Sequence, residues 1–131
     1  MTLVHGSEEV MAENQNALSR SVLDSVKHIC GVEPSMTHFD DPILLHLNGV
    51  IFTTKQIGLD PIITTRITDS STTWEQLYGP DCDVFVVENY IGLKVKELFD
   101  PPTNSSAMEA LRRNIDQYEW RINVAQPKES E

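Results

Sequence analysis

The sequence predicts a mainly α-helical fold: a compact four-helix domain with a short extended, hairpin-like excursion between helices two and three, and flexible termini. Three observations lead to this prediction. The chain has 131 residues, enough for one domain with a modest core. Apolar residues recur at helical spacing in four segments. Glycine or proline follows the first three, where a helix would end.

The first helix is expected to begin at Ala17, within a helical domain that spans residues 17–125. Residues 1–16 are rich in Glu, Asn and Gln and predict a flexible N-terminal arm. Gly31 is placed to close the helix in a left-handed conformation. The apolar residues of this helix are Leu18, Val22, Val26 and Ile29.

The second helix is expected to start where Asp40 or Asp41 can accept hydrogen bonds from free backbone N–H groups, with Pro42 at the first helical position. Gly58 marks its expected end. Gly49 costs about 1 kcal/mol relative to alanine, which indicates either a close approach by another helix or a tolerated cost. The apolar stripe consists of Ile43, Leu44, Leu47, Val50 and Ile51.

The extended excursion is expected in residues 59–71, where β-prone Ile and Thr residues alternate with no helical period. A short helical turn should follow from Trp74, which we expect to be a local anchor. Thr72 or Thr73 can cap this turn, and Glu75 or Gln76 can complete the capping box.

The third helix is expected from about Asp83 to Phe99, and its wide apolar surface predicts a central position. A fourth helix should follow a cap within residues 104–106. Trp120 and Val124 lie off its apolar seam, about a third of a turn around, and belong either to a wide core or to an interface. The seam consists of Met108, Leu111, Ile115, Tyr118 and Ile122; residues 126–131 predict a mobile tail.

The charge balance is strongly acidic, with 20 acidic and 10 basic residues and a formal net charge of -10. Such a chain is not suited to gripping phosphates over a broad surface. The charge would suit a surface along which DNA slides without sticking, although solubility is the more common explanation. With only Cys30 and Cys82 and no signal-like or membrane-spanning stretch, we expect assembly in the cytoplasm and no membrane association.

No motif for catalysis, phosphate binding or metal binding is present in the sequence. The nearest approach to a metal or catalytic cluster is His38, Asp40 and Asp41 with His46, but the two aspartates are better explained as helix caps. Cys82 is a poor nucleophile candidate because acidic residues flank it. We therefore expect neither an enzyme nor a cofactor.

Positive charge is concentrated on the last two helices, and solvated faces are the default explanation. In an acidic oligomer these residues could instead pair with acids of a neighbouring copy and fix its register. The residues are Lys94, Lys96, Arg112, Arg113 and Arg121.

Several ordered segments resemble the small head-tail connector proteins of long-tailed bacteriophages and prophages, over Leu18 to Ala125. The segments that carry the resemblance are THFDDPIL (37–44), QIG (56–58), TW (73–74), YIGLKV (90–95), LFDPP (98–102) and EWRINVA (119–125). The resemblance implies a helical subunit of the virion neck, in a ring that is usually dodecameric. It further implies binding to the portal protein and to the next neck or tail-completion ring, around a channel through which DNA passes.

Under this hypothesis the excursion, the last helix and the tail are the expected places of contact between subunits or rings. A helical adaptor or regulatory domain that forms no ring is the main alternative, and a nucleic-acid-binding domain is disfavoured by the charge. The interface candidates are Ile63, Thr65, Arg66, Ile67, Arg112, Arg113, Trp120, Arg121, Val124, Pro127 and Lys128.

Overall fold

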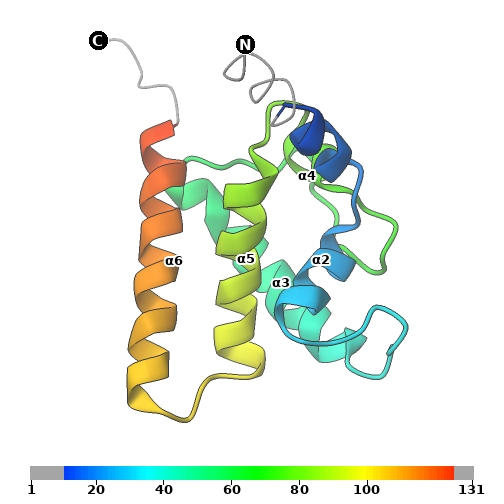
Figure 1. The fold of residues 1–131 in the computed structure, drawn as a ribbon. Helices are drawn as coiled ribbons and strands as arrows, with labels where there is room; N and C mark the ends of the chain where they lie inside the picture. Colours follow the sequence, from blue (N-terminus) through cyan, green and yellow to red (C-terminus); the bar gives the residue numbers. More distant parts are fainter. Residues whose placement is uncertain (1–10, 126–131) are drawn as a thin grey trace.

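The computed structural model describes residues 11–125 and is mainly helical, as predicted (Figure 1). Residues 11–18 are helical, and no strand longer than an isolated bridge forms within residues 11–125. The four-helix description is too simple because residues 11–18 and two short helices accompany the other four. The remaining elements are α2 (Val22–Ile29), α3 (Asp40–Thr53), the 3₁₀ helix η1 (Thr54–Ile57), α4 (Trp74–Tyr78), α5 (Val84–Phe99) and α6 (Ser105–Ala125).

Helix α5 is central, as its broad apolar surface predicts. It packs against α2, α3 and α6, and in Figure 1 it stands between α6 on one side and α2 on the other, with α3 crossing behind. Helix α6 runs back along α5 and forms one edge of the molecule. One side of α6 is therefore buried against α5, while the opposite side is left to solvent or to a partner.

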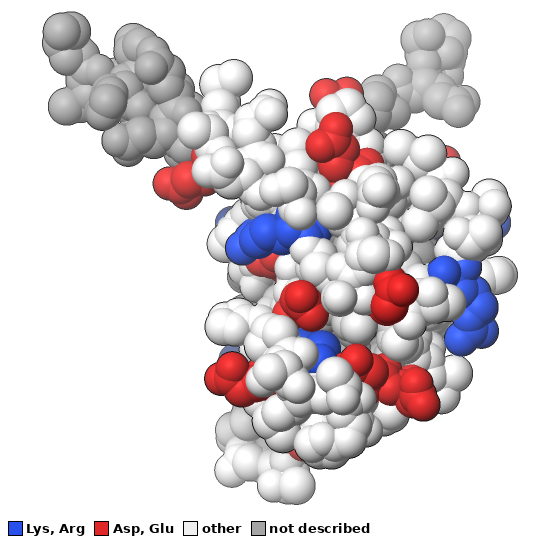
Figure 2. Space-filling model, turned by 90° about the vertical axis from the view of Figure 1, so that its right-hand side faces the viewer, with Lys and Arg blue, Asp and Glu red and all other residues white. Residues whose placement is uncertain are grey.

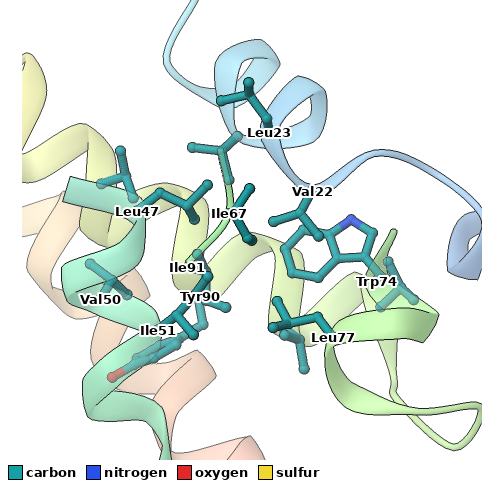
Figure 3. Packing of buried hydrophobic residues seen from close by; sticks show 14 of the residues in the cluster. Val22, Leu23, Leu47, Val50, Ile51, Ile67, Trp74, Leu77, Tyr90 and Ile91 are labelled. Atoms are coloured by element: carbon teal, nitrogen blue, oxygen red, sulfur yellow. The ribbon is translucent and has the colours of Figure 1, made fainter. Parts of the chain in front are cut away.

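The core gathers side chains from all these helices and from the segment between η1 and α4 (Figure 3). Trp74 is fully buried, and its indole Nε1 donates a hydrogen bond to Ser25 Oγ at 3.2 Å, which confirms the predicted anchor. Ile67 points among labelled side chains of α2, α3 and α5. Each such fully buried aliphatic side chain contributes about 1.5–3 kcal/mol to the free energy of unfolding.

The first predicted helix is interrupted. Residues 19–21 leave the helical conformation, and Ser21 forms an antiparallel bridge with Thr73. The Ser21 hydroxyl then caps α2 by accepting a hydrogen bond from Asp24 N at 3.1 Å. Residues 11–16, which we predicted to be a flexible arm, are instead helical, while residues 1–10 lie outside the described part of the chain.

The residues that cap or terminate helices were the best-predicted features of the fold. Gly31 and Gly58 have φ values of 80° and 94°, so both adopt the left-handed conformation expected after a helix. Thr73 and Gln76 form the predicted capping box at the start of α4. At α3 the prediction was wrong, because Phe39 is the N-cap residue and no side chain caps it.

Asp40, the first residue of α3, pairs with a buried lysine and does not cap the helix. Lys27 is only 1% exposed, and its Nζ lies 2.7 Å from Asp40 Oδ1. The same ammonium group donates a hydrogen bond to the Pro34 carbonyl oxygen at 2.9 Å. A charge removed from water needs a partner, so the pairing with Lys27 takes precedence over the weaker benefit of a helix cap.

The two helix-interior glycines face different surroundings. A Cβ added at Gly92 would lie 2.3 Å from Ile29 Cδ1 and 3.1 Å from Ile29 Cβ, so α2 and α5 approach closely there. A Cβ added at Gly49 would meet nothing within 4 Å. Of the two explanations offered for Gly49, the structure therefore excludes a close approach by another helix within residues 11–125.

Candidate interface surfaces

The buried thiols are unsuited to nucleophilic chemistry at neutral pH. Burial raises the pKa of Cys30 to about 11 and that of Cys82 to about 12. For Cys82 the negative charge of Asp83 contributes less than burial, so the prediction of a poor nucleophile holds for a different main reason. Over residues 11–125, no group of three or more His, Cys, Asp or Glu side chains is arranged to hold a metal ion.

The outward side of α6 carries two of the predicted interface residues. Trp120 is 66% exposed and Val124 is 47% exposed, whereas Ile115 and Ile122 on the opposite side of the helix are buried against the core. A tryptophan left so exposed buries little of its apolar surface within its own chain. Between the two interpretations of Trp120, core packing is therefore wrong.

The three predicted arginines on α6 differ in their surroundings. Arg112 forms an ion pair with Glu97 of α5, with 3.0 Å between Nε and Oε2, and so is already paired within the chain. The Arg121 guanidinium lies 5.9 Å from the centre of the Tyr118 ring. Arg113 is exposed and forms no ion pair with residues 11–125. Arg113 is therefore the most available of the three to a partner.

The predicted excursion is not a hairpin, since residues 59–71 contain no strand. Thr65 and Arg66 are exposed, and Ile63 is partly buried against the core. Ile67 is only 3% exposed and is a core residue, so it is not available as a surface contact. Two further candidates, Pro127 and Lys128, lie outside the described residues.

Asparagine side chains hold this excursion and the start of α5 in place, which our sequence predictions missed. Asn48 of α3 accepts from Ile67 N at 2.8 Å and donates to Ile67 O at 2.9 Å. Asn14 accepts from Val84 N at 3.0 Å and donates to Cys82 O at 3.1 Å. Each amide thus pairs with backbone as a neighbouring strand would, and Asn14 supplies the cap of α5 that Asp83 does not.

A second exposed apolar surface lies on the outward side of α3, where no site was predicted. Leu45 and Phe52 are 62% and 69% exposed, and the open position of Gly49 lies between them. The Lys55 ammonium group lies 5.6 Å from the centre of the Phe52 ring. The only sequence signal was the seven-residue spacing of two apolar residues that do not belong to the buried stripe.

Two grooves flank the outward side of α3. The larger, about 870 Å³, separates α3 from the excursion and includes Pro61 and Arg66 in its walls. The smaller, about 320 Å³, lies between α3 and α5 and is lined in part by Lys94 and Leu98. Leu45 and Gly49 line both grooves. The outward side of α3 is therefore a ridge between two hollows, a shape that a partner helix can straddle.

A third exposed apolar surface combines Met11 and Phe85, which are 66% and 60% exposed and line a groove of about 740 Å³. Glu13, Asp81 and Asp83 make this groove acidic. Figure 2 shows the side of the molecule at the right of Figure 1, where acidic side chains are dispersed among few basic ones. That face presents no continuous basic surface to nucleic acid.

No helix within residues 11–125 has the length and apolar character to span a membrane. Comparison with known proteins identifies one family: a family model described as "Phage connector protein" matches residues 22–129. No curated protein and no solved structure gives a match.

Proposed function

This chain belongs to the phage connector protein family, and from this membership we propose that it is a structural subunit of the virion neck. In this proposal twelve copies of the chain, the number that the resemblance to head-tail connector proteins implies, form a ring beneath the portal protein. The ring binds the portal above and the next neck or tail-completion ring below. The observation that carries the proposal is the family match, which extends from the start of α2 to beyond the end of α6.

The distribution of exposed apolar side chains supports a subunit with several neighbours. Exposed large apolar residues lie on α3, on α6, and at Met11 and Phe85 near the N-terminal helical segment, so they come from several elements of the fold. A ring subunit needs one surface for each lateral neighbour and another for each adjoining ring. A chain that binds a single partner needs only one such surface.

The formal charge of -10 supports the proposed position around a DNA channel. An acidic lumen repels phosphates, so DNA can move through it without being held. The chain supplies no catalytic group in this proposal, in keeping with a structural family.

Cryo-electron microscopy of the virion neck tests the proposal directly. The expected result is a ring of helical density, into which residues 11–125 fit, between the portal and the tail. The symmetry of this ring gives the copy number. A neck fully accounted for by other proteins would overturn the proposed location.

The alternative is a helical adaptor or regulatory protein that binds one partner and forms no ring. Measuring the mass of the complex that this chain forms with the portal protein distinguishes the two. A neck ring predicts many copies of the chain per portal ring, whereas an adaptor predicts substoichiometric or no binding.

A further inference from the structure

We propose that neighbouring copies are joined head to tail, with the outward side of α6 in one copy lying across the ridge of α3 in the next. This inference rests on the proposed ring and specifies which two surfaces meet. A closed ring requires two different, complementary surfaces on each subunit. The outward sides of α3 and α6 are two such surfaces, and nothing within residues 11–125 covers either.

The α6 surface is a continuous stripe along one side of the helix. Its members recur at intervals of three or four residues, so they share a face. The upper part of the stripe is apolar, with Trp120 and Val124 exposed, and the lower part carries charge. The stripe consists of Glu109, Arg113, Asp116, Trp120 and Val124.

Along the α3 surface an apolar position, a small one and a basic one follow in turn, and these can face Val124, Trp120 and Asp116 of the stripe. Leu45, Gly49 and Phe52 follow one another along the outward side of the helix, and Lys55 follows on η1. The open space at Gly49, between two large exposed side chains, forms a notch that can accept an aromatic ring. Within its own chain, Gly49 only weakens the helix, by about 1 kcal/mol relative to alanine.

Charge favours this pairing over a contact between two α6 surfaces or two α3 surfaces. Copies with a net charge of -10 repel one another, so a stable contact must oppose acid to base. Lys55 and Arg66 beside the α3 ridge form no ion pair with residues 11–125, and the same is true of Glu109 and Asp116 on α6. The stripe also holds Arg113, but its two acids outnumber this base, so the bases beside the ridge meet a surface that is acidic overall.

The order of residues along the α6 stripe and along the α3 ridge defines how the two helices align. With the helices antiparallel, Val124 lies near Leu45, Trp120 sits over Gly49, and Asp116 reaches Lys55. Four residues of α6 span about 6 Å and six residues beyond Gly49 span about 9 Å, a difference that the Lys55 side chain can bridge. Trp120 is the central aromatic of this contact, and its loss should weaken association about 30-fold.

The test uses two variants of the full chain, each defective in one surface. Phe52→Asp impairs the α3 ridge and Trp120→Asp impairs the α6 stripe; both side chains are exposed, so the fold should persist and is checked by circular dichroism. Met11→Asp, at a position as exposed as Trp120 and outside α3 and α6, is the matched control. Association is measured by native mass spectrometry and analytical ultracentrifugation at increasing concentration.

We expect the wild type and Met11→Asp to associate, and each of the two interface variants to remain monomeric alone. Mixed together, the two interface variants should form a one-to-one dimer, because one intact ridge and one intact stripe remain. A contact between identical surfaces cannot give this result. In addition, Lys55→Glu should weaken association, and adding Asp116→Lys to the same chain should restore it.

A mixture that stays monomeric while the wild type associates would overturn the inference, as would a wild type that does not associate at any accessible concentration. Neither result removes the chain from the neck, which the microscopy of the virion tests separately. Conversely, the one-to-one dimer would support the contact even if the chain were absent from the neck.

Discussion

The two glycines inside helices provide a paired test of how closely α2 and α5 pack. Gly92→Ala should destabilise the chain although alanine is the better helix former. The added Cβ would lie 2.3 Å from Ile29 Cδ1, which can rotate away, and 3.1 Å from both Ile29 Cβ and Cγ2. Cβ moves only with α2, and Cγ2 is restricted because a helix allows isoleucine essentially one χ1 rotamer. Overpacking of this kind costs about 1–3 kcal/mol, and the helix propensity of alanine offsets about 1 kcal/mol of it. Because three atoms of Ile29 lie at 3.1 Å or closer, the overpacking cost should fall in the upper part of this range, about 2–3 kcal/mol, and we expect a net loss of about 1–2 kcal/mol.

Gly49→Ala is the matched control, since the same substitution in α3 introduces no contact within 4 Å. It should stabilise the monomer by about 0.5–1 kcal/mol. Urea denaturation followed by circular dichroism, at a concentration where the chain is monomeric, measures the free energy of unfolding of both variants.

The double variant Ile29→Val/Gly92→Ala removes the nearest methyl group. Its loss of stability should be smaller than the sum of the two single losses. If Gly92→Ala is as stable as the wild type, or if the two substitutions add independently, the close approach of α2 and α5 is not the reason that glycine occupies position 92.

Three further predictions concern the remaining polar and buried groups. Asn48→Ala should cost about 1–3 kcal/mol and speed amide exchange at Ile67, because a backbone N–H and C=O lose their partners; Asn89→Ala, which loses only a bond within its own helix, should change neither by as much. Lys27→Ala should lower the free energy of unfolding by about 2–4 kcal/mol, measured by thermal or urea denaturation. Lys27→Met keeps the aliphatic length of the side chain and should lower it by at most about half as much. Equal losses for the two variants would contradict the assigned packing. Because burial raises the pKa of Cys30 from 9.0 to about 11, the unfolded chain loses the thiol proton first, and this group's contribution to stability should decline as pH rises from about 9 to 11; Cys30→Ser should reduce that decline in pH-dependent urea titrations.

Structural features that depend on only a few neighbouring residues were predicted correctly. The left-handed Gly58 and the capping box of Thr73 with Gln76 depend on chain geometry within a single turn, so spacing was sufficient. The central position of α5 followed from the width of its apolar surface.

The failures share a dependence on residues far away in the chain. The break before α2 requires Ser21 to meet Thr73, and no local pattern reports that pairing. Asp40 has every local property of a helix cap, but Lys27 reaches it across the fold. The bonds from Asn14 to residues 82 and 84 likewise join segments that only the folded chain brings together.

The interface itself stays a prediction, but the exposure of its candidate residues was predicted in part. Trp120 and Val124 were recognisable because helical geometry places them away from the seam of α6. Ile67 was misjudged because alternation of apolar and polar residues does not show which side of an extended segment is buried. Leu45 and Phe52 were not predicted because two exposed apolar residues seven positions apart do not by themselves distinguish a contact surface from apolar residues scattered over a surface.

The bonds of Asn48 also bear on how the protein ages. An asparagine followed by glycine is chemically vulnerable, since the glycine nitrogen can attack the side-chain amide and release ammonia. Here Gly49 lies inside α3, where its N–H is committed to the helix, and the Asn48 amide is bonded to Ile67. Both reacting groups are thus held away from the geometry of attack. Asn48 is therefore protected from deamidation only for as long as α3 stays folded.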